Sequence, residues 1–255
     1  KFTKTIAIAN KESIICGWNL IKKNLEKYKT YFIPVDSEHF SIWYALKNNK
    51  DLIDKVILTA SGGPFYDLPL KKFKDIKIAH ALRHPNWKMG KKISVDSASM
   101  MNKGLELIEA HWLFDAAPEQ IQVVIHPQSI IHSMVEYIDG SVLAQLGNPD
   151  MRTPIAHALA YPDRIESGVE PLDIFKVAQL DFEAPDFSKF PCLRLGQDAL
   201  TQGGTAPLVF NAANEIAVEA FLRNRIGFLQ ISDIIDHSLN TSSNKQTDSL
   251  DELLE

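Results

Sequence analysis

The fold class can be inferred from residues 5–35, TIAIANKESIICGWNLIKKNLEKYKTYFIPV. This stretch opens on an apolar run at 5–9, typical of a buried strand, and closes on a second strand-like run at 31–35. Between these runs, apolar residues from Ile14 to Leu25 recur at steps of four, three and four, which is the spacing of one helical face. A strand, a helix and a strand within about 30 residues form a βαβ unit. The stretch therefore predicts an α/β sheet with parallel strands.

The rest of the chain mixes helical and strand-like patterns. We expect, in order, a helix over Phe40–Leu52, a short strand over Val56–Thr59, a helix over Ser97–Phe114, a hairpin turning at Asp139-Gly140, an extended connector over Tyr161–Lys189 and helices from Leu193 onward. Residues 61–90 form a long segment of mixed polarity, which is typical of a lid or a binding loop.

Composition excludes several classes of protein. The 255 residues are 45% hydrophobic and 23% charged, which is the balance of a globular protein rather than of a disordered chain or a coiled-coil rod. No run approaches the ~20 apolar residues of a membrane span. The net charge of −5 argues against binding to nucleic acid. With two cysteines, Cys16 and Cys192, a disulfide scaffold is excluded and a reducing cytosol is favoured.

Both ends of the chain lack the features of natural termini. It begins Lys1-Phe2-Thr3, without an initiator Met or a signal sequence, and residues 251–255 resemble the start of a helix. We therefore expect the chain to be part of a longer protein.

Two acidic residues follow the second strand. Asp36 and Glu38 are alternate residues, and alternate residues of a strand share a face. Neighbouring carboxylates repel one another unless a cation or a proton intervenes, and oxygen ligands favour Mg²⁺ or Mn²⁺. Taken alone, such a pair is more often two solvated acids on a loop.

The helix expected from Ser97 carries further polar residues. Asn102, Glu106 and Glu109 lie within about 60° of one another, opposite an apolar stripe. One of the acids could complete a three-carboxylate metal site, but helical spacing does not choose between Glu106 and Glu109. Asn102 and Lys103 could hold a phosphate, or Lys103 and Glu106 could be an exposed ion pair.

Other polar residues offer anion contacts. Ser61 precedes a glycine-rich turn, and Ser97 is expected at a helix N-terminus. Trp87, in the long loop with His84, suits a lid over a ligand. His126 and His132 fall on expected strands and are interpreted as structural. No zinc-type spacing, Gly-x-Ser-x-Gly elbow or Gly-x-Gly-x-x-Gly loop occurs.

A series of longer motifs occurs in order between Thr5 and Leu239. They are ANKES (9–13), PVDSEH (34–39), SGGPF (61–65), HPNWKMG (84–90), SVDS (94–97), MMNKGLE (100–106), HPQS (126–129), NPDMRTP (148–154) and NAANE (211–215). Together they resemble the 1-deoxy-D-xylulose 5-phosphate reductoisomerases, which are NADPH- and metal-dependent enzymes of non-mevalonate isoprenoid synthesis.

The resemblance implies roles for the matching positions. It implies metal ligation by Asp36, Glu38 and Glu106, and catalytic roles for Lys11, Glu38, His84 and Glu106. Implied substrate contacts are Lys11, Ser37, Glu38, Ser61, His84, Trp87, Ser97, Asn102, Lys103 and Glu106, of which Ser61, Ser97, Asn102 and Lys103 would hold the phosphate. Implied cofactor contacts are Asn10, Glu12, Met89 and Gly90, with Trp87 and Met89 in a mobile lid.

The resemblance also implies an architecture. It divides the chain into the end of a Rossmann-like dinucleotide domain (1–36), an α+β catalytic domain with a lid (37–160), a linker (161–188) and an incomplete C-terminal helical bundle (189–255). The overall class is thus α/β and α+β, multidomain. The family's glycine-rich nucleotide loop has no counterpart here, so we expect these 255 residues alone to bind NADPH poorly.

The implied activity is conversion of 1-deoxy-D-xylulose 5-phosphate to 2-C-methyl-D-erythritol 4-phosphate in a bacterial cytoplasm, by a homodimer that uses NADPH and Mg²⁺ or Mn²⁺, with Co²⁺ a further option. The expected partner is a small sugar phosphate, without nucleic acid or membrane. Two alternatives stay open: a metal-dependent sugar-phosphate isomerase or aldolase without nicotinamide, and a non-catalytic fragment that binds metal and sugar phosphate.

Overall fold

The βαβ unit forms as the sequence predicts. The computed structural model describes residues 3–46, 52–247 and 249–254. Strand β1 (Thr5–Ile8), helix α1 (Lys11–Tyr28) and strand β2 (Tyr31–Pro34) follow one another, and the two strands pair in parallel. The expectation of a buried first strand is wrong, because β1 is exposed or half-buried along its length and pairs only with β2 among the described residues.

A second, mixed sheet has the order β4-β3-β5-β6. Its strands are β3 (Ile53–Ala60), β4 (Ile121–Ile125), β5 (Ile131–Tyr137) and β6 (Val142–Leu146). Strand β3 pairs in parallel with β4 and antiparallel with β5, and β5 pairs antiparallel with β6. The turn between β5 and β6 contains Asp139 and Gly140, with Gly140 at φ +81°, which confirms the predicted hairpin.

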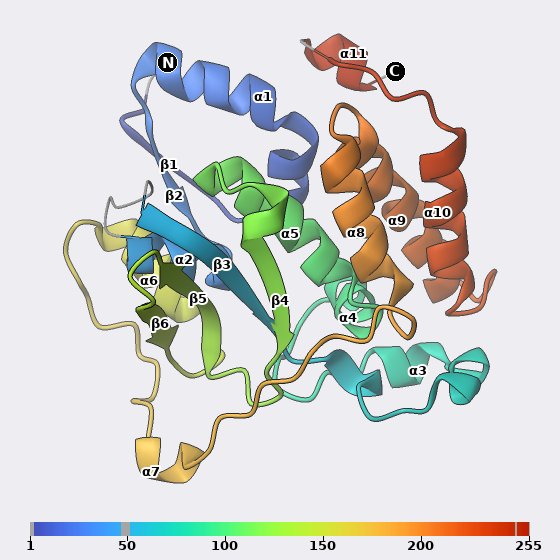
Figure 1. Cartoon of the computed structure of the whole chain (residues 1–255), viewed down its shortest axis with the longest axis horizontal. Helices are drawn as coiled ribbons and strands as arrows, with labels where there is room; N and C mark the ends of the chain where they lie inside the picture. Colours follow the sequence, from blue (N-terminus) through green and yellow to red (C-terminus); the bar gives the residue numbers. More distant parts are fainter. Residues whose placement is uncertain (1–2, 47–51, 248, 255) are drawn as a thin grey trace.

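Helices cover the sheet and build the other half of the molecule (Figure 1). The longer ones are α2 (Ser37–Leu46), α4 (Lys91–Ala98), α5 (Met101–Phe114), α6 (Arg152–Ala160), α8 (Pro191–Gln202), α9 (Ala206–Leu222) and α10 (Gln230–Thr241). Short helices are α3 (Ile78–Ala81), α7 (Ile174–Val177) and α11 (Leu250–Leu254). Helices α8, α9 and α10 lie together beyond α5, so the expected C-terminal helices are confirmed.

Helix α5 is the centre of the hydrophobic core. It packs against α8 on one side and contacts α1, α2 and the sheet on others. Met101, Leu105 and Ile108 of the predicted apolar stripe are fully buried. Burial of each such side chain contributes roughly 1.5–3 kcal/mol to folding. The polar face of α5 is buried as well, so its acids are not on a solvated surface.

Two glycines allow α5 and α8 to approach closely. A Cβ atom on Gly196 would lie 2.6 Å from the Cα atom of Gly104, a separation that backbone atoms cannot tolerate. We expect Gly196→Ala to lower the free energy of unfolding by about 1–3 kcal/mol, because overpacking must push the helices apart. Gly17→Ala in α1 is the control, since its Cβ would meet nothing within 4 Å. Equal denaturation midpoints for the two variants in urea would contradict the prediction.

The single helix expected over Ser97–Phe114 is wrong. Helix α4 ends at Ala98, and Met100 then takes a left-handed conformation at φ +61° before α5 begins. Ser97 therefore lies in the last turn of α4 rather than at a helix N-terminus. A methionine carries no sequence signal for positive φ, which glycine would have given.

Helix α2 begins earlier than expected. It starts at Ser37, so Glu38 lies in a first helical turn instead of on a strand face shared with Asp36. The carboxylate of Asp36 accepts a hydrogen bond from the Glu38 N–H at 3.1 Å, which is the geometry of an N-terminal cap. The expected continuation of this helix beyond Leu46 falls on residues 47–51, outside the described part of the chain.

The long segment 61–90 is more ordered than a simple loop. It contains 3₁₀ helices at Gly63–Phe65 and Leu70–Asp75 in addition to α3. Phe73 is 1% exposed and packs against other aromatic rings, so the first part of the segment is anchored to the core.

The connector over 161–189 is irregular apart from α7 and one bridge between Glu183 and Ile125, as expected. The division of the chain into four segments stays a prediction. Within the described residues, no helix combines the length and the apolar character needed to cross a bilayer.

Candidate active site

A cavity of about 240 Å³ lies where the starts of three helices meet the carboxyl end of β3. Helix N-termini carry partial positive charge, so this arrangement favours anionic groups. The residues predicted for the site that line the cavity are Lys11, Asp36, Ser37, Glu38, Ser61, His84, Trp87, Met89, Ser97, Asn102, Lys103 and Glu106. Of the described residues predicted for the site, Asn10, Glu12 and Gly90 lie outside this lining.

Three carboxylates meet on one wall of the cavity. Oxygen atoms of Asp36, Glu38 and Glu106 lie within 4.8 Å of one another. Burial, together with the carboxylate of Glu106, raises the pKa of Glu38 to about 7. Burial and neighbouring carboxylates both disfavour the ionised form of Glu38, and Lys103 favours it. The crowded, all-oxygen donor set fits Mg²⁺ or Mn²⁺.

Two buried lysines form ion pairs with these carboxylates. The Lys11 Nζ atom lies 2.6 Å from Asp36 Oδ2 and 2.8 Å from Glu106 Oε1. The Lys103 Nζ atom lies 2.9 Å from Glu38 Oε1 and also contacts Glu106. Burial alone would lower the pKa of Lys11, but Asp36 and Glu106 raise it well above its usual value. Lys11 therefore remains a cation beside the proposed metal ligands.

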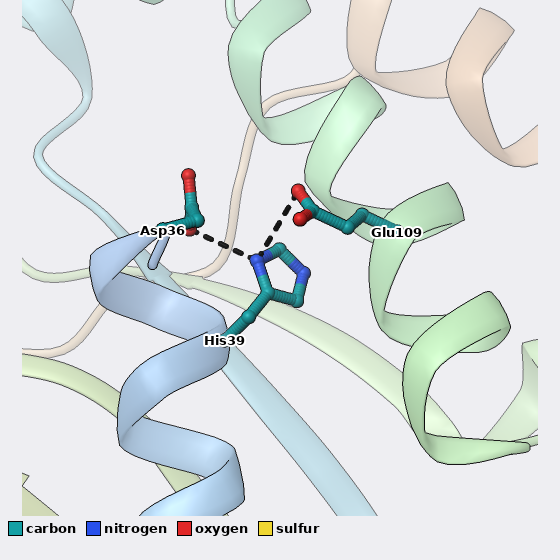
Figure 2. A group of neighbouring side chains, drawn as sticks. All are labelled: Asp36, His39 and Glu109. Carbon is teal, nitrogen blue, oxygen red and sulfur yellow. Dashed lines mark hydrogen bonds and ion pairs between the residues drawn. The ribbon is translucent and has the colours of Figure 1, made fainter. Parts of the chain in front are cut away.

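Behind Asp36 lies a second group, formed by His39 and Glu109 (Figure 2). The His39 Nδ1 atom lies 2.9 Å from Asp36 Oδ1 and 3.3 Å from Glu109 Oε2, and Nε2 lies 3.1 Å from the carbonyl oxygen of Glu106. Burial alone would lower the pKa of His39, but Glu109 and Asp36 raise it to about 9. Both ring nitrogens then donate hydrogen bonds, and the ring is a cation at neutral pH.

Another part of the cavity lining is formed by Ser61 and His84. The backbone N–H groups of Asn86 and Trp87 both donate to His84 Nδ1, at 3.1 and 3.0 Å. Since Nδ1 accepts, the hydrogen of the neutral ring is on Nε2, which donates to Ser61 Oγ at 3.0 Å. The Gly63 N–H also donates to Ser61 Oγ, at 3.2 Å. The Ser61 hydroxyl hydrogen is thereby directed away from these two donors and suits an anionic oxygen.

The protonation of His84 gives a pH prediction. Burial lowers its pKa from 6.5 to about 4, and a proton on Nδ1 would also displace two N–H donors. Because the folded pKa is the lower one, the unfolded chain takes up the proton first as the pH falls. The stability that neutral His84 supports is complete above about pH 6.5 and decreases from there towards pH 4.

His84→Asn removes this titration. We expect its stability deficit relative to the wild type to shrink as the pH falls from 6.5 to 4. Guanidinium denaturation at a series of pH values measures the deficit. A constant deficit across this range would contradict the assigned neutral state.

The residues predicted to hold phosphate have different surroundings in the cavity. Asn102 donates to Glu106 Oε1 at 2.5 Å and accepts from Lys11 at 3.0 Å, so its amide belongs to the carboxylate network. Lys103 belongs to the same carboxylate network. Ser97 and Ser61 line the cavity but do not contact that network.

The predicted cofactor residues border the cavity rather than line it, apart from Met89. Asn10 caps α1 through a 3.0 Å bond from the Ser13 N–H, and its amide donates to Glu12 at 2.9 Å. A Cβ atom at Gly90 would meet nothing within 4 Å, so open space adjoins this residue. The Glu12 carboxylate is half-buried and also pairs with Lys92 at 3.1 Å.

Sequence reasoning missed residues that contribute to the site. Glu109 was considered only as an alternative to Glu106, and His39 received no role, although the motif PVDSEH includes it. His132, interpreted as structural, lines the cavity with its ring 5.8 Å from that of Trp87. His126 is structural, since Nδ1 bonds the carbonyl of Asp181 and Nε2 accepts from two backbone N–H groups.

Comparison with known proteins identifies the family. The family model described as the 1-deoxy-D-xylulose 5-phosphate reductoisomerase C-terminal domain matches residues 32–114, and the model described as the DXP reductoisomerase C-terminal domain matches residues 146–255. Among curated proteins, the 1-deoxy-D-xylulose 5-phosphate reductoisomerase of Nitrosomonas eutropha is 56% identical over 98% of this chain and 62% of its own length. That of Ectopseudomonas mendocina is 54% identical over 99% of this chain and 66% of its own length.

Solved structures agree with these matches. The enzyme from Zymomonas mobilis in complex with NADPH has a TM-score of 0.92 and 48% identity, covering 98% of this chain and 65% of that one. A DOX-P reductoisomerase in complex with NADPH, fosmidomycin and magnesium has a TM-score of 0.90 and 50% identity, covering 93% of this chain and 61% of that one. The chain spans less than two thirds of the length of these relatives. It belongs to the 1-deoxy-D-xylulose 5-phosphate reductoisomerase family.

Proposed function

We propose that this protein is an NADPH- and divalent-metal-dependent reductoisomerase that converts 1-deoxy-D-xylulose 5-phosphate to 2-C-methyl-D-erythritol 4-phosphate. The main support is a cavity lined by three neighbouring carboxylates and by a serine that is hydrogen-bonded to a histidine. Membership of the family supports the reaction, and the NADPH and magnesium in similar solved structures support the cofactors.

On this proposal Asp36, Glu38 and Glu106 hold Mg²⁺ or Mn²⁺. The bound ion supplies Lewis acidity towards the carbonyl and hydroxyl oxygens of the substrate while its carbon skeleton rearranges. Lys11 and Lys103 hold the three carboxylates together, since Lys11 pairs with Asp36 and Glu106, and Lys103 pairs with Glu38 and Glu106. Lys11 lines the cavity, and its ammonium group pairs with Asp36 and Glu106 and donates to the Asn102 amide oxygen at 3.0 Å.

The phosphate of the substrate is assigned to Ser61, Ser97, Asn102 and Lys103, which all line the cavity. Ser61 would donate its hydroxyl hydrogen to it. A phosphate fixed at one end orients the reacting carbons at the other, which lowers the entropic part of the barrier. His84 positions Ser61 through their 3.0 Å hydrogen bond.

Residues 84–90 are proposed to be a lid. Trp87 lies against His132 at the cavity, where its indole ring excludes water during the reaction. NADPH supplies the hydride that reduces the aldehyde formed by the rearrangement. We assign contacts with its nicotinamide end to Asn10, Glu12, Met89 and Gly90.

A homodimer is part of the proposal. Strand β6 is an edge of the mixed sheet, and Val142, Leu143 and Leu146 on it are each more than a third exposed. Exposed apolar edge strands favour pairing with another strand. A wild-type dimer that becomes a monomer in Leu143→Lys, by light scattering, supports this interface, and an unchanged mass contradicts it.

The test of function is direct. The purified protein, supplied with 1-deoxy-D-xylulose 5-phosphate, Mn²⁺ and enough NADPH to offset the poor affinity expected of these 255 residues alone, should consume NADPH and release 2-C-methyl-D-erythritol 4-phosphate, detected by mass spectrometry. Omission of the metal should stop both. Isomerised or cleaved sugar phosphate without loss of NADPH would instead favour an isomerase or aldolase, and binding without turnover would favour a non-catalytic role.

A further inference from the structure

Glu109 is a buried carboxylate that the proposed chemistry leaves without a task. It is 1% exposed and does not line the cavity, whereas Glu106, one helical turn earlier on α5, does. Burial raises the pKa of Glu109 to about 7, so keeping this residue at the position costs stability. A costly buried acid beside a site of charged groups points to a role in that site.

The contacts of Glu109 lead through one residue. Its Oε2 atom lies 3.3 Å from His39 Nδ1, and that nitrogen lies 2.9 Å from Asp36 Oδ1 (Figure 2). The other ring nitrogen lies 3.1 Å from the carbonyl oxygen of Glu106. The His39 ring is also stacked on Phe114, with the planes 12° apart. His39 thus has contacts with two proposed metal ligands and a fixed plane.

These contacts fix the spacing between the proposed metal ligands on the two helices. Asp36 and Glu38 belong to the start of α2, whereas Glu106 belongs to α5, so the three carboxylates depend on how the two helices are spaced. His39 is on α2, and Glu109 and the Glu106 carbonyl are on α5. The histidine is therefore a bridge between the helices. The Asp36 Oδ1 atom accepts hydrogen bonds from His39 and from the Glu38 N–H. The other oxygen, Oδ2, therefore faces the proposed ion, and it lies 2.6 Å from Lys11 Nζ.

The Asp36, His39 and Glu109 group has the composition of a metal site itself, but its surroundings argue against that role. All three residues are closely packed, and neither His39 nor Glu109 lines the cavity. The His39 Nδ1 atom already donates to Asp36 at 2.9 Å and lies 3.3 Å from Glu109. The open carboxylate group, which includes Glu38 and Glu106, is the one that an ion can reach.

We propose that Glu109 is a positioning residue that acts through His39 to hold Asp36 and Glu106 at the spacing required for the divalent ion. The inference rests on the proposed metal site and deepens it. Residues that orient metal ligands typically contribute 10–100-fold to metal affinity. Glu109 differs from a ligand in one measurable way: its contribution should exist only while His39 is present.

A double-mutant cycle on the purified protein tests this dependence. Mn²⁺ dissociation constants are measured by electron paramagnetic resonance for the wild type, E109A, H39A and H39A/E109A. We expect E109A to weaken Mn²⁺ binding by about 10–100-fold. We expect H39A/E109A to bind no more weakly than H39A. E109Q should bind more tightly than E109A, because its amide oxygen keeps a polar atom near the Oε2 position, which lies 3.3 Å from His39 Nδ1.

Three results would overturn the inference. They are an unchanged affinity in E109A, a full further loss on adding E109A to H39A, and equal losses in E109Q and E109A. The matched control is D96N, which alters a carboxylate that is 2% exposed and paired with Lys92 at 2.9 Å. It should leave Mn²⁺ affinity unchanged, and an equal loss in D96N would also contradict a specific role. Absence of Mn²⁺ binding by the wild type would instead refute the metal site itself.

Discussion

Replacement of Glu106 by Gln should lower kcat of the proposed reaction by about 10³-fold, with the fold intact. The amide keeps the size of the side chain and can still bond Lys11 and Asn102, which now lie at 2.8 and 2.5 Å from Glu106 Oε1. It removes one of three charges from the proposed ligand set. Lewis-acid assistance contributes several kcal/mol to such reactions, and each 1.36 kcal/mol is tenfold in rate. Steady-state kinetics at saturating Mn²⁺ measure the loss.

Glu119→Gln is the control for this substitution. Glu119 is exposed in the 3₁₀ turn that directly precedes β4 in the sequence. It does not line the cavity. Its kcat should match that of the wild type. A Glu106→Gln protein with more than a tenth of wild-type kcat would remove Glu106 from the account of metal binding.

Replacement of Lys11 by Met should cost about 3–5 kcal/mol of unfolding free energy in metal-free buffer. The Lys11 side chain is 8% exposed, and its ammonium group pairs with Asp36 and Glu106, which are themselves buried. Loss of one member of a buried charge network leaves the others uncompensated, which is the costly case. Mg²⁺ should restore part of the loss, because an ion that binds only the folded state stabilises it.

Lys22→Met is the matched control, since Lys22 pairs with Asp115 at a similar 2.8 Å but both side chains are exposed. Exposed pairs contribute about 0.2–1 kcal/mol. Urea denaturation with and without Mg²⁺ compares the two variants. Equal stability of the two variants would show that the Lys11 network is not a buried charge system.

Sequence patterns predicted correctly those elements whose formation depends on residues close in sequence. The apolar spacing from Ile14 to Leu25 gave α1, and Asp139-Gly140 gave the hairpin, because each depends on residues close in sequence. The break between α4 and α5 was missed because Met100 adopts positive φ without a residue type that announces it. The start of α2 was missed because Asp36 and Glu38 suit both a strand end and a helix start.

The site depended on contacts between distant segments. Helical spacing placed Glu106 and Glu109 on one polar face and could not separate them, and both are buried. Their different surroundings come from elsewhere in the chain: Lys11 lies beside Glu106, and His39 lies beside Glu109. Spacing within one helix contains no information about these partners. The resemblance to a family supplied the choice of Glu106, and it supplied nothing about Glu109.

Titration of the purified protein with Mn²⁺, followed by the loss of the free-ion resonance signal, tests whether the three carboxylates form a metal centre. We predict one ion bound per chain, and no binding at that site once Asp36, Glu38 and Glu106 are replaced together by Asn, Gln and Gln. Wild-type binding that persists in the triple variant, or a wild type that binds no ion, would contradict a metal centre formed by these carboxylates.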